Sequence, residues 1–203
     1  MIIAALLMTL QVAVQDPRLE RLDPETRGLV GAVIDSAREV GLPSEPLVQR
    51  ALEGVTKGAA GARIVAAVRR LSADLGTARG ALGTHASSPE LEAGVAALRA
   101  GATLQLLAHL RDVRKPPLTM ALSVLADLVA GGVPSDSAAA AILVLAPNAR
   151  DADLVDFRRA VERDIALGAP PGTATSVRVN AGAASPNAIH APPPGNAPPP
   201  RRP

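Results

Sequence analysis

The sequence contains no cysteine, tryptophan or tyrosine, and a single phenylalanine, Phe157. Without cysteine no disulfide framework can form, so the fold must be held by packing alone. Without aromatic side chains, binding of single-stranded nucleic acid is disfavoured, because such binding depends on aromatic surfaces on which bases stack. The core must therefore rest on Ala, Leu and Val, the commonest apolar residues of this chain.

Clustered positive charge is also scarce. The 203 residues include 19 arginines but only 2 lysines, and the formal net charge is +2. Residues 16–172 carry 18 basic and 19 acidic side chains, a net charge of −1, whereas residues 173–203 carry three arginines and no acidic residue. Nucleic-acid binding needs clustered basic charge, so we expect no nucleic-acid partner.

Catalytic and metal-binding motifs are missing as well. The sequence has no phosphate-binding loop, dinucleotide fingerprint, nucleophile elbow or zinc-ligand spacing. His85 stands in a loop without a second ligand at suitable spacing, and His109 is interpreted as a packed or surface residue. The sequence around Asp151, Asp153 and Asp156 lacks the glycine and the closing glutamate of a calcium loop. These aspartates stand at a predicted helix start, where negative side chains interact favourably with the positive end of the helix dipole. We predict no catalytic residue, no cofactor and no metal.

What is present is helical periodicity. Apolar residues recur at helical spacing in eight segments, which predicts an all-α fold, either an irregular helical bundle or a short α-solenoid. In the first segment the predicted core stripe includes Leu29, Val33, Ala37 and Val40, and in the last it includes Phe157. The seventh segment is apolar nearly all round, which predicts the most buried helix. The eight predicted helices cover about residues 24–40, 45–57, 61–82, 88–100, 103–113, 118–130, 136–146 and 150–167.

The helices are separated by turns that begin with glycine, many of the form Gly-x-Pro. Gly41 and Gly132 open two similar turns, and looser ones begin at Gly58, Gly101 and Gly168. Glycine reaches the left-handed conformation that ends a helix without steric cost. Proline then prevents the helix from continuing.

Serine follows the proline in the turns that begin at Gly41 and Gly132. Ser44 and Ser135 are predicted to cap the next helix, and each is followed by an acidic residue that suits the helix dipole. Asp23 is predicted to cap the first helix, with Pro24 as its first residue.

Arginines on the third predicted helix fall mostly outside its apolar stripe. They are Arg63, Arg69, Arg70 and Arg79. This placement is typical of a solvated helix surface, although a basic interaction face is the alternative.

The two ends of the chain differ from the helical part. Residues 2–14 form an apolar run too short for an ordinary membrane-spanning helix, which suits a signal-peptide core although no basic residue precedes it. Residues 1–15 are therefore interpreted as a signal peptide, cleaved near Ala13–Asp16, with a buried N-terminal helix or an uncleaved anchor as alternatives. Residues 16–23 are predicted to be a linker and residues 24–168 one helical domain. Residues 169–203, rich in Pro, Ala and Gly, are predicted to form a disordered tail.

An internal duplication is a further prediction. Shifting the chain by about 90 residues places Gly41 on Gly132 and Leu71 on Val161, so the unit would occupy about 24–82 and 117–167. Chance matching between alanine-rich segments is the alternative.

We expect an exported helical interaction or structural module of a bacterial envelope, binding another envelope protein or itself, with no stable transmembrane span after signal cleavage. Two alternatives stay open, a hydrolase with an unrecognised Asp/His site and a helical protein bound to a membrane surface.

Overall fold

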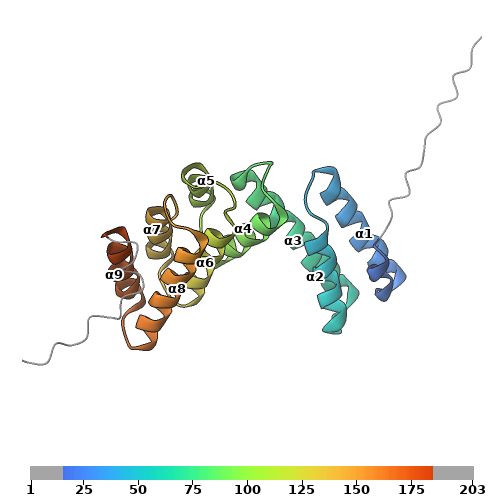
Figure 1. Ribbon diagram of the computed structural model, residues 1–203. Coiled ribbons are helices and arrows are strands. Elements are labelled where there is room, and N and C mark those ends of the chain that lie inside the picture. Colours follow the sequence, from blue (N-terminus) through green and yellow to red (C-terminus); the bar gives the residue numbers. More distant parts are fainter. Residues whose placement is uncertain (1–15, 185–203) are drawn as a thin grey trace, which may run out of the picture. The chain divides into compact units, whose positions relative to one another are not determined.

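The computed structural model describes residues 16–184 and shows an all-α fold, as the sequence predicts (Figure 1). In this part of the chain the helices are η1 (Pro17–Arg21), α1 (Pro24–Glu39), α2 (Glu45–Thr56), α3 (Gly61–Leu82), α4 (Ser88–Ala100), α5 (Leu104–Val113), α6 (Thr119–Ala130), α7 (Ser135–Leu145), α8 (Asp151–Ala166) and α9 (Pro171–Ala184).

All eight predicted helices are present, with bounds that differ by at most a residue or two. The ninth, α9, lies inside the range 169–203 that was predicted to be a disordered tail, so helical structure continues to residue 184. Residues 185–203 lie outside the described residues, as does the predicted signal peptide, 1–15. Pro171 is compatible with a helix because it occupies the first helical position, where no N–H is needed.

The described part of the chain divides into two compact units, unit 1 with residues 16–74 and unit 2 with residues 75–184, and the division falls within α3. The single helical domain predicted over residues 24–168 spans parts of both units. The predicted linker, residues 16–23, contains η1, and Leu19 and Leu22 are buried. These residues thus belong to the folded part of unit 1 rather than to a linker.

The predicted glycine turns are confirmed by backbone geometry. Each of the five glycines has a positive φ, between 62° and 110°. Each donates its N–H to the carbonyl three residues earlier, and the next residue donates to the carbonyl five residues before it, at 2.8–3.0 Å. This pair of hydrogen bonds satisfies carbonyls that the helix end would otherwise leave without partners. The five glycines are Gly41, Gly58, Gly101, Gly132 and Gly168.

The predicted serine caps are wrong. Ser44 precedes α2 with helical angles, φ −81° and ψ −30°, and its side chain makes no capping hydrogen bond. Ser135 is the first residue of α7 rather than its cap, and Pro134 occupies the capping position. An N-cap residue needs a non-helical backbone to aim its side chain at the free amides, and Ser44 lacks that geometry. The predicted Asp23 cap is confirmed, since its carboxylate accepts the N–H of Thr26 at 2.9 Å.

Unit 1 brings its helices together through glycines that leave no room for a side chain. A Cβ at Gly61 would clash with Thr26 Oγ1, so the start of α3 touches the start of α1. A Cβ at Gly54 would lie 2.7 Å from Ile64 Cγ1, which joins α2 to α3 in the same way. The first turn of α3 is therefore fixed against both preceding helices.

Unit 2 contains three helical hairpins, α4–α5, α6–α7 and α8–α9, in each of which the second helix begins three residues after the turn glycine. The first helices pack in the order α4, α6, α8, and the second helices pack in the order α5, α7, α9 (Figure 1). The turns also lie in sequence: a Cβ at Gly101 would lie 3.8 Å from Ser135, and one at Gly132 would lie 3.9 Å from Pro171. Successive packing of similar hairpins is the arrangement of an α-solenoid.

In unit 2, the predicted core position of Phe157 on α8 is confirmed, because its side chain is fully buried. Burial disagrees with the sequence for α7, the predicted most buried helix, because Val144 is 53% exposed and Ala140 is exposed. Helix α7 packs against α5, α6 and α9, and these contacts leave Ala140 and Val144 at the surface. Among residues 16–184, no helix combines the length and apolarity needed to cross a membrane.

Candidate functional site

The titratable residues considered from the sequence are not assembled into a reactive site in residues 16–184. His85 and His109 are exposed. Each of the three clustered aspartates forms an ion pair with an arginine: Asp151 with Arg114, Asp153 with Arg150 and Asp156 with Arg159. Within the same residues, no group of three or more His, Asp or Glu side chains could hold a metal ion.

A buried ion pair joins α8 to α9. The carboxylate of Asp164 accepts hydrogen bonds from Arg178 Nε at 2.6 Å and Nη2 at 2.7 Å, and the two residues are 8% and 4% exposed. The hydrogen bonds from Arg178 hold the pKa of Asp164 below its usual range although burial opposes the shift. Charges buried in this way need each other, so the pair ties α9 to the hairpin rather than offering a reactive group.

A buried carboxylate, Glu90, connects the start of α4 to the start of α6. It accepts hydrogen bonds from the Ser87 N–H and hydroxyl at 2.8 and 2.7 Å and from the Leu118 N–H at 2.8 Å. Burial raises the pKa of Glu90, but these hydrogen bonds together lower it more, so the net pKa is below the usual value. Three donors leave little capacity for a substrate, which indicates a structural role.

Arginines also close helix ends in unit 2. Arg111 donates to the Ala81 carbonyl at the end of α3 at 2.8 Å. Arg114 donates to the carbonyls of Ala146 and Ala149, just after α7, both at 2.7 Å. Cations near a helix C-terminus suit the negative end of the helix dipole. These guanidinium groups are therefore occupied by the fold.

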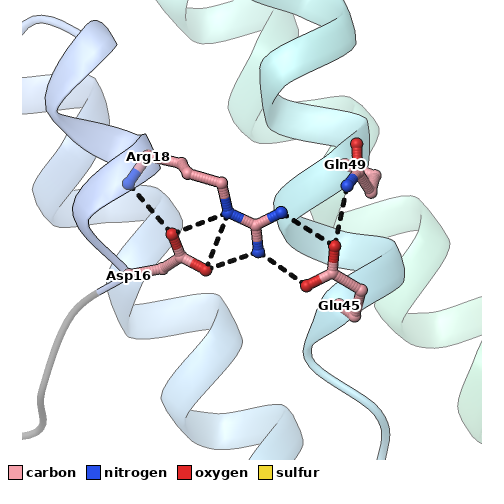
Figure 2. A network of polar contacts seen from close by, with 4 residues as sticks. All are labelled: Asp16, Arg18, Glu45 and Gln49. Carbon is pink, nitrogen blue, oxygen red and sulfur yellow. Dashed lines mark hydrogen bonds and ion pairs between the residues drawn. The ribbon is translucent and has the colours of Figure 1, made fainter.

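An exposed network links η1 to α2 in unit 1 (Figure 2). Arg18 donates to Asp16 and, at 2.9 and 2.6 Å, to both carboxylate oxygens of Glu45, which also accepts from Gln49 at 2.7 Å. The hydrogen bonds from Arg18 and Gln49 lower the pKa of Glu45 to about 2. All members of the network have partners, so it too is explained by helix contact.

One open groove in unit 1 is different. It lies between α1 and the first part of α3 and has a volume of about 450 Å³. We call it the α1–α3 groove; its lining residues are Leu29, Ala32, Val33, Ser36, Arg69, Ser72 and Ala73.

The α1 side of the groove is an exposed apolar ridge. Leu29 is 42% exposed and Val33 is half-buried, whereas Val30, Ile34 and Ala37 fill the core of the same helix. Two of the predicted core residues thus face the groove instead, and Val40, also in the predicted stripe, is exposed. The sequence feature that indicates this groove is the apolar stripe of α1, which is wider than the face that packs against the core.

The α3 side of the groove carries a cation. The side chain of Arg69 is exposed and makes no hydrogen bond or ion pair with any residue that the structure describes. The residues three and four positions away on α3 are Val65, Ala66, Ser72 and Ala73, none of them acidic. The α1–α3 groove therefore combines exposed aliphatic side chains, two serines and an unpaired guanidinium. Such a groove can bind a ligand, but its lining contains no nucleophile next to an activating base.

The chain matches no protein-family model, and no significant similarity to a curated protein or to a solved structure was found.

Proposed function

We propose that this protein is a helical interaction module that binds an α-helical segment of another protein in the α1–α3 groove. The observation that carries the proposal is the position of Leu29 and Val33 at the surface of an open groove, although both belong to the apolar stripe of α1. Helix-in-groove recognition uses apolar side chains spaced along one face of the bound helix.

The dimensions of the groove support a helical occupant. Leu29 and Ser36 are seven residues apart on α1, which corresponds to about 10 Å at 1.5 Å per residue. Two helical turns have about the same length. Ala32 and Ala73 are small and exposed, so they leave room for the backbone of an incoming helix.

The test is a titration of the full chain against labelled amphipathic helical peptides, followed by fluorescence anisotropy. Burying a leucine side chain contributes about 1.5–3 kcal/mol, so Leu29→Glu should weaken binding about tenfold or more. Leu104→Glu is the matched control, because Leu104 is 43% exposed on α5 and lies outside the groove. Absence of binding by any amphipathic peptide, or an equal loss in both variants, would contradict the proposal.

The proposal includes export to a bacterial envelope. Its support is the apolar run at residues 2–14, together with the fact that Asp16 already belongs to the fold, because its carboxylate caps η1. Mass spectrometry of the native protein should give a mature N-terminus close to residues 13–16. Recovery of the intact N-terminus alone from the envelope fraction would exclude cleavage. Under the proposal, the proline-rich residues 185–203 act as a spacer.

We also propose that residues 24–82 and 117–167 arose by duplication. The support is the shared order of helix, glycine turn, helix, turn and helix, with Gly41 and Gly132 making the same pair of backbone hydrogen bonds. Turns at Gly58, Gly101 and Gly168 have the same geometry, so the turn alone does not distinguish a long repeat from the shorter hairpin repeat.

A further inference from the structure

We infer that the occupant of the α1–α3 groove is an amphipathic helix with an acidic residue beside its apolar face, and that Arg69 selects it. This inference rests on the proposed function and adds the chemistry of the partner. Arginines that connect elements in this structure already have acceptors, whereas Arg69 lines the groove with its guanidinium group available for a ligand.

Local sequence explains why Arg69 stays unpaired. Helical arginines of this chain that form ion pairs within one helix have an acidic residue three or four positions away, as Arg38 does with Asp35 and Arg50 with Glu53. Arg69 has no acidic residue at that spacing, and the acidic residues of α1 do not line the groove. Helices α1 and α3 therefore place no carboxylate in the groove for this guanidinium.

The surroundings of Arg69 make a carboxylate the matching group. A guanidinium presents its N–H donors in a planar fork that fits a carboxylate with two parallel hydrogen bonds. The groove is also lined by Ser36 and Ser72, whose hydroxyl groups can complete the hydrogen bonding of a bound acidic side chain. Leu29 and Val33, on the other helix, would contact the apolar face of the same ligand. The apolar side chains thus lie on the α1 side of the groove and the positive charge on the α3 side. An amphipathic helix with an acidic residue beside its apolar face matches this arrangement.

The experiment compares three peptides with an identical apolar face and Glu, Gln or Lys at the flanking position. Each is titrated into the full chain and into Arg69→Glu. An exposed ion pair contributes up to about 1 kcal/mol, so the Glu peptide should bind the unaltered chain roughly threefold to fivefold more tightly than the Gln peptide, and the Lys peptide most weakly. In Arg69→Glu the order should reverse, with the Lys peptide binding best.

Arg63→Glu is the matched control, since Arg63 is an exposed arginine on the same helix that does not line the groove. This variant should keep the preference for the Glu peptide. The preference should also shrink when the salt concentration is raised from about 0.1 M to about 1 M, because exposed charges are screened. Circular dichroism melting curves should be the same for both variants.

The outcomes separate this inference from the proposed function. Equal binding of the Glu and Gln peptides that is still abolished by Leu29→Glu would leave the groove as a helix-binding site and overturn the role of Arg69. No binding of any peptide would overturn both. Sedimentation that reveals a dimer dissociated by Leu29→Glu would show that a second copy of this chain occupies the groove, which also overturns the inference.

Discussion

Arginine has two different uses in the two units of this protein. In unit 2, Arg178 is buried and bound to Asp164, and Arg111 and Arg114 close the ends of helices. In the α1–α3 groove of unit 1, Arg69 is exposed, and the described residues provide it with no partner. In unit 2, guanidinium groups thus connect helices through hydrogen bonds to carbonyl and carboxylate oxygens. What sets Arg69 apart from other exposed arginines is its place in the lining of the groove.

The largest expected effect separates these two uses. Removing one partner of a buried ion pair leaves an uncompensated charge, so Arg178→Met should lower the free energy of unfolding by about 3–5 kcal/mol. Arg69→Met should change it by less than about 0.5 kcal/mol, as is usual for surface positions. Chemical denaturation of both variants tests the comparison. Equal losses of stability would show that Arg69 also has a structural role.

The turn glycines give the next largest effect. Gly132 has a φ of +93°, which is unfavourable for any residue with a side chain and worst for a β-branched one. Gly132→Val should therefore destabilise the fold by about 2 kcal/mol or more. Gly28, in contrast, lies within α1, and a Cβ added there would meet no atom within 4 Å, so Gly28→Ala should stabilise the fold by about 0.5–1 kcal/mol. Thermal melting of the two variants should thus shift in opposite directions.

Acidification should affect unit 2 more than unit 1. The folded-state pKa values of Asp164 and Glu90 are lowered, from ordinary values of 3.8 and 4.5, and both residues are buried. Such groups stabilise the fold above the ordinary carboxyl range, and this contribution is lost as the pH falls through their folded-state pKa values. In unit 1, Glu45 is exposed and screened by solvent. Hydrogen exchange at pH 7 and near pH 3 should show greater loss of protection in residues 75–184, and a larger loss in residues 16–74 would contradict this account.

The smallest effect distinguishes a true helix cap from an apparent one. Thr103 Oγ1 accepts the Leu106 N–H at 3.1 Å, so Thr103→Ala should cost about 1 kcal/mol. Ser44 makes no capping hydrogen bond, and Ser44→Ala should change the free energy of unfolding by less than about 0.5 kcal/mol. Equilibrium denaturation of the pair measures the difference. A cost near 1 kcal/mol for Ser44→Ala would restore the cap that the sequence predicts.

Local rules explain why so much of the fold is predictable from the sequence. The positive φ of Gly41 and Gly132 and the Asp23 cap depend on residues close in the chain, and helical periodicity locates eight helices. What fails depends on distant contacts. Helix α9 has Gly172 and many Thr, Ser and Asn residues that form helices poorly, and it is stabilised by burial of Ala174 and by the bond from Arg178 to α8.

The candidate site is less predictable for the same reason. Periodicity places Leu29 and Val33 on the apolar side of α1, but it cannot show that the core ends at Val30 and Ile34. The position of Arg69 outside the stripe of α3 is visible in the sequence. Its lack of a partner, and its place beside Leu29, follow only from the packing of α1 against α3.

The most direct test of the central claim is hydrogen exchange of the full chain with and without the Glu peptide, at a peptide concentration well above its dissociation constant. A helix bound in the α1–α3 groove covers α1 and the first part of α3, so amides in residues 24–39 and 61–74 should exchange more slowly, and those of α7 and α9 should not change. Protection confined to residues 135–184, or no protection in either unit, would contradict the claim that the groove is the binding site.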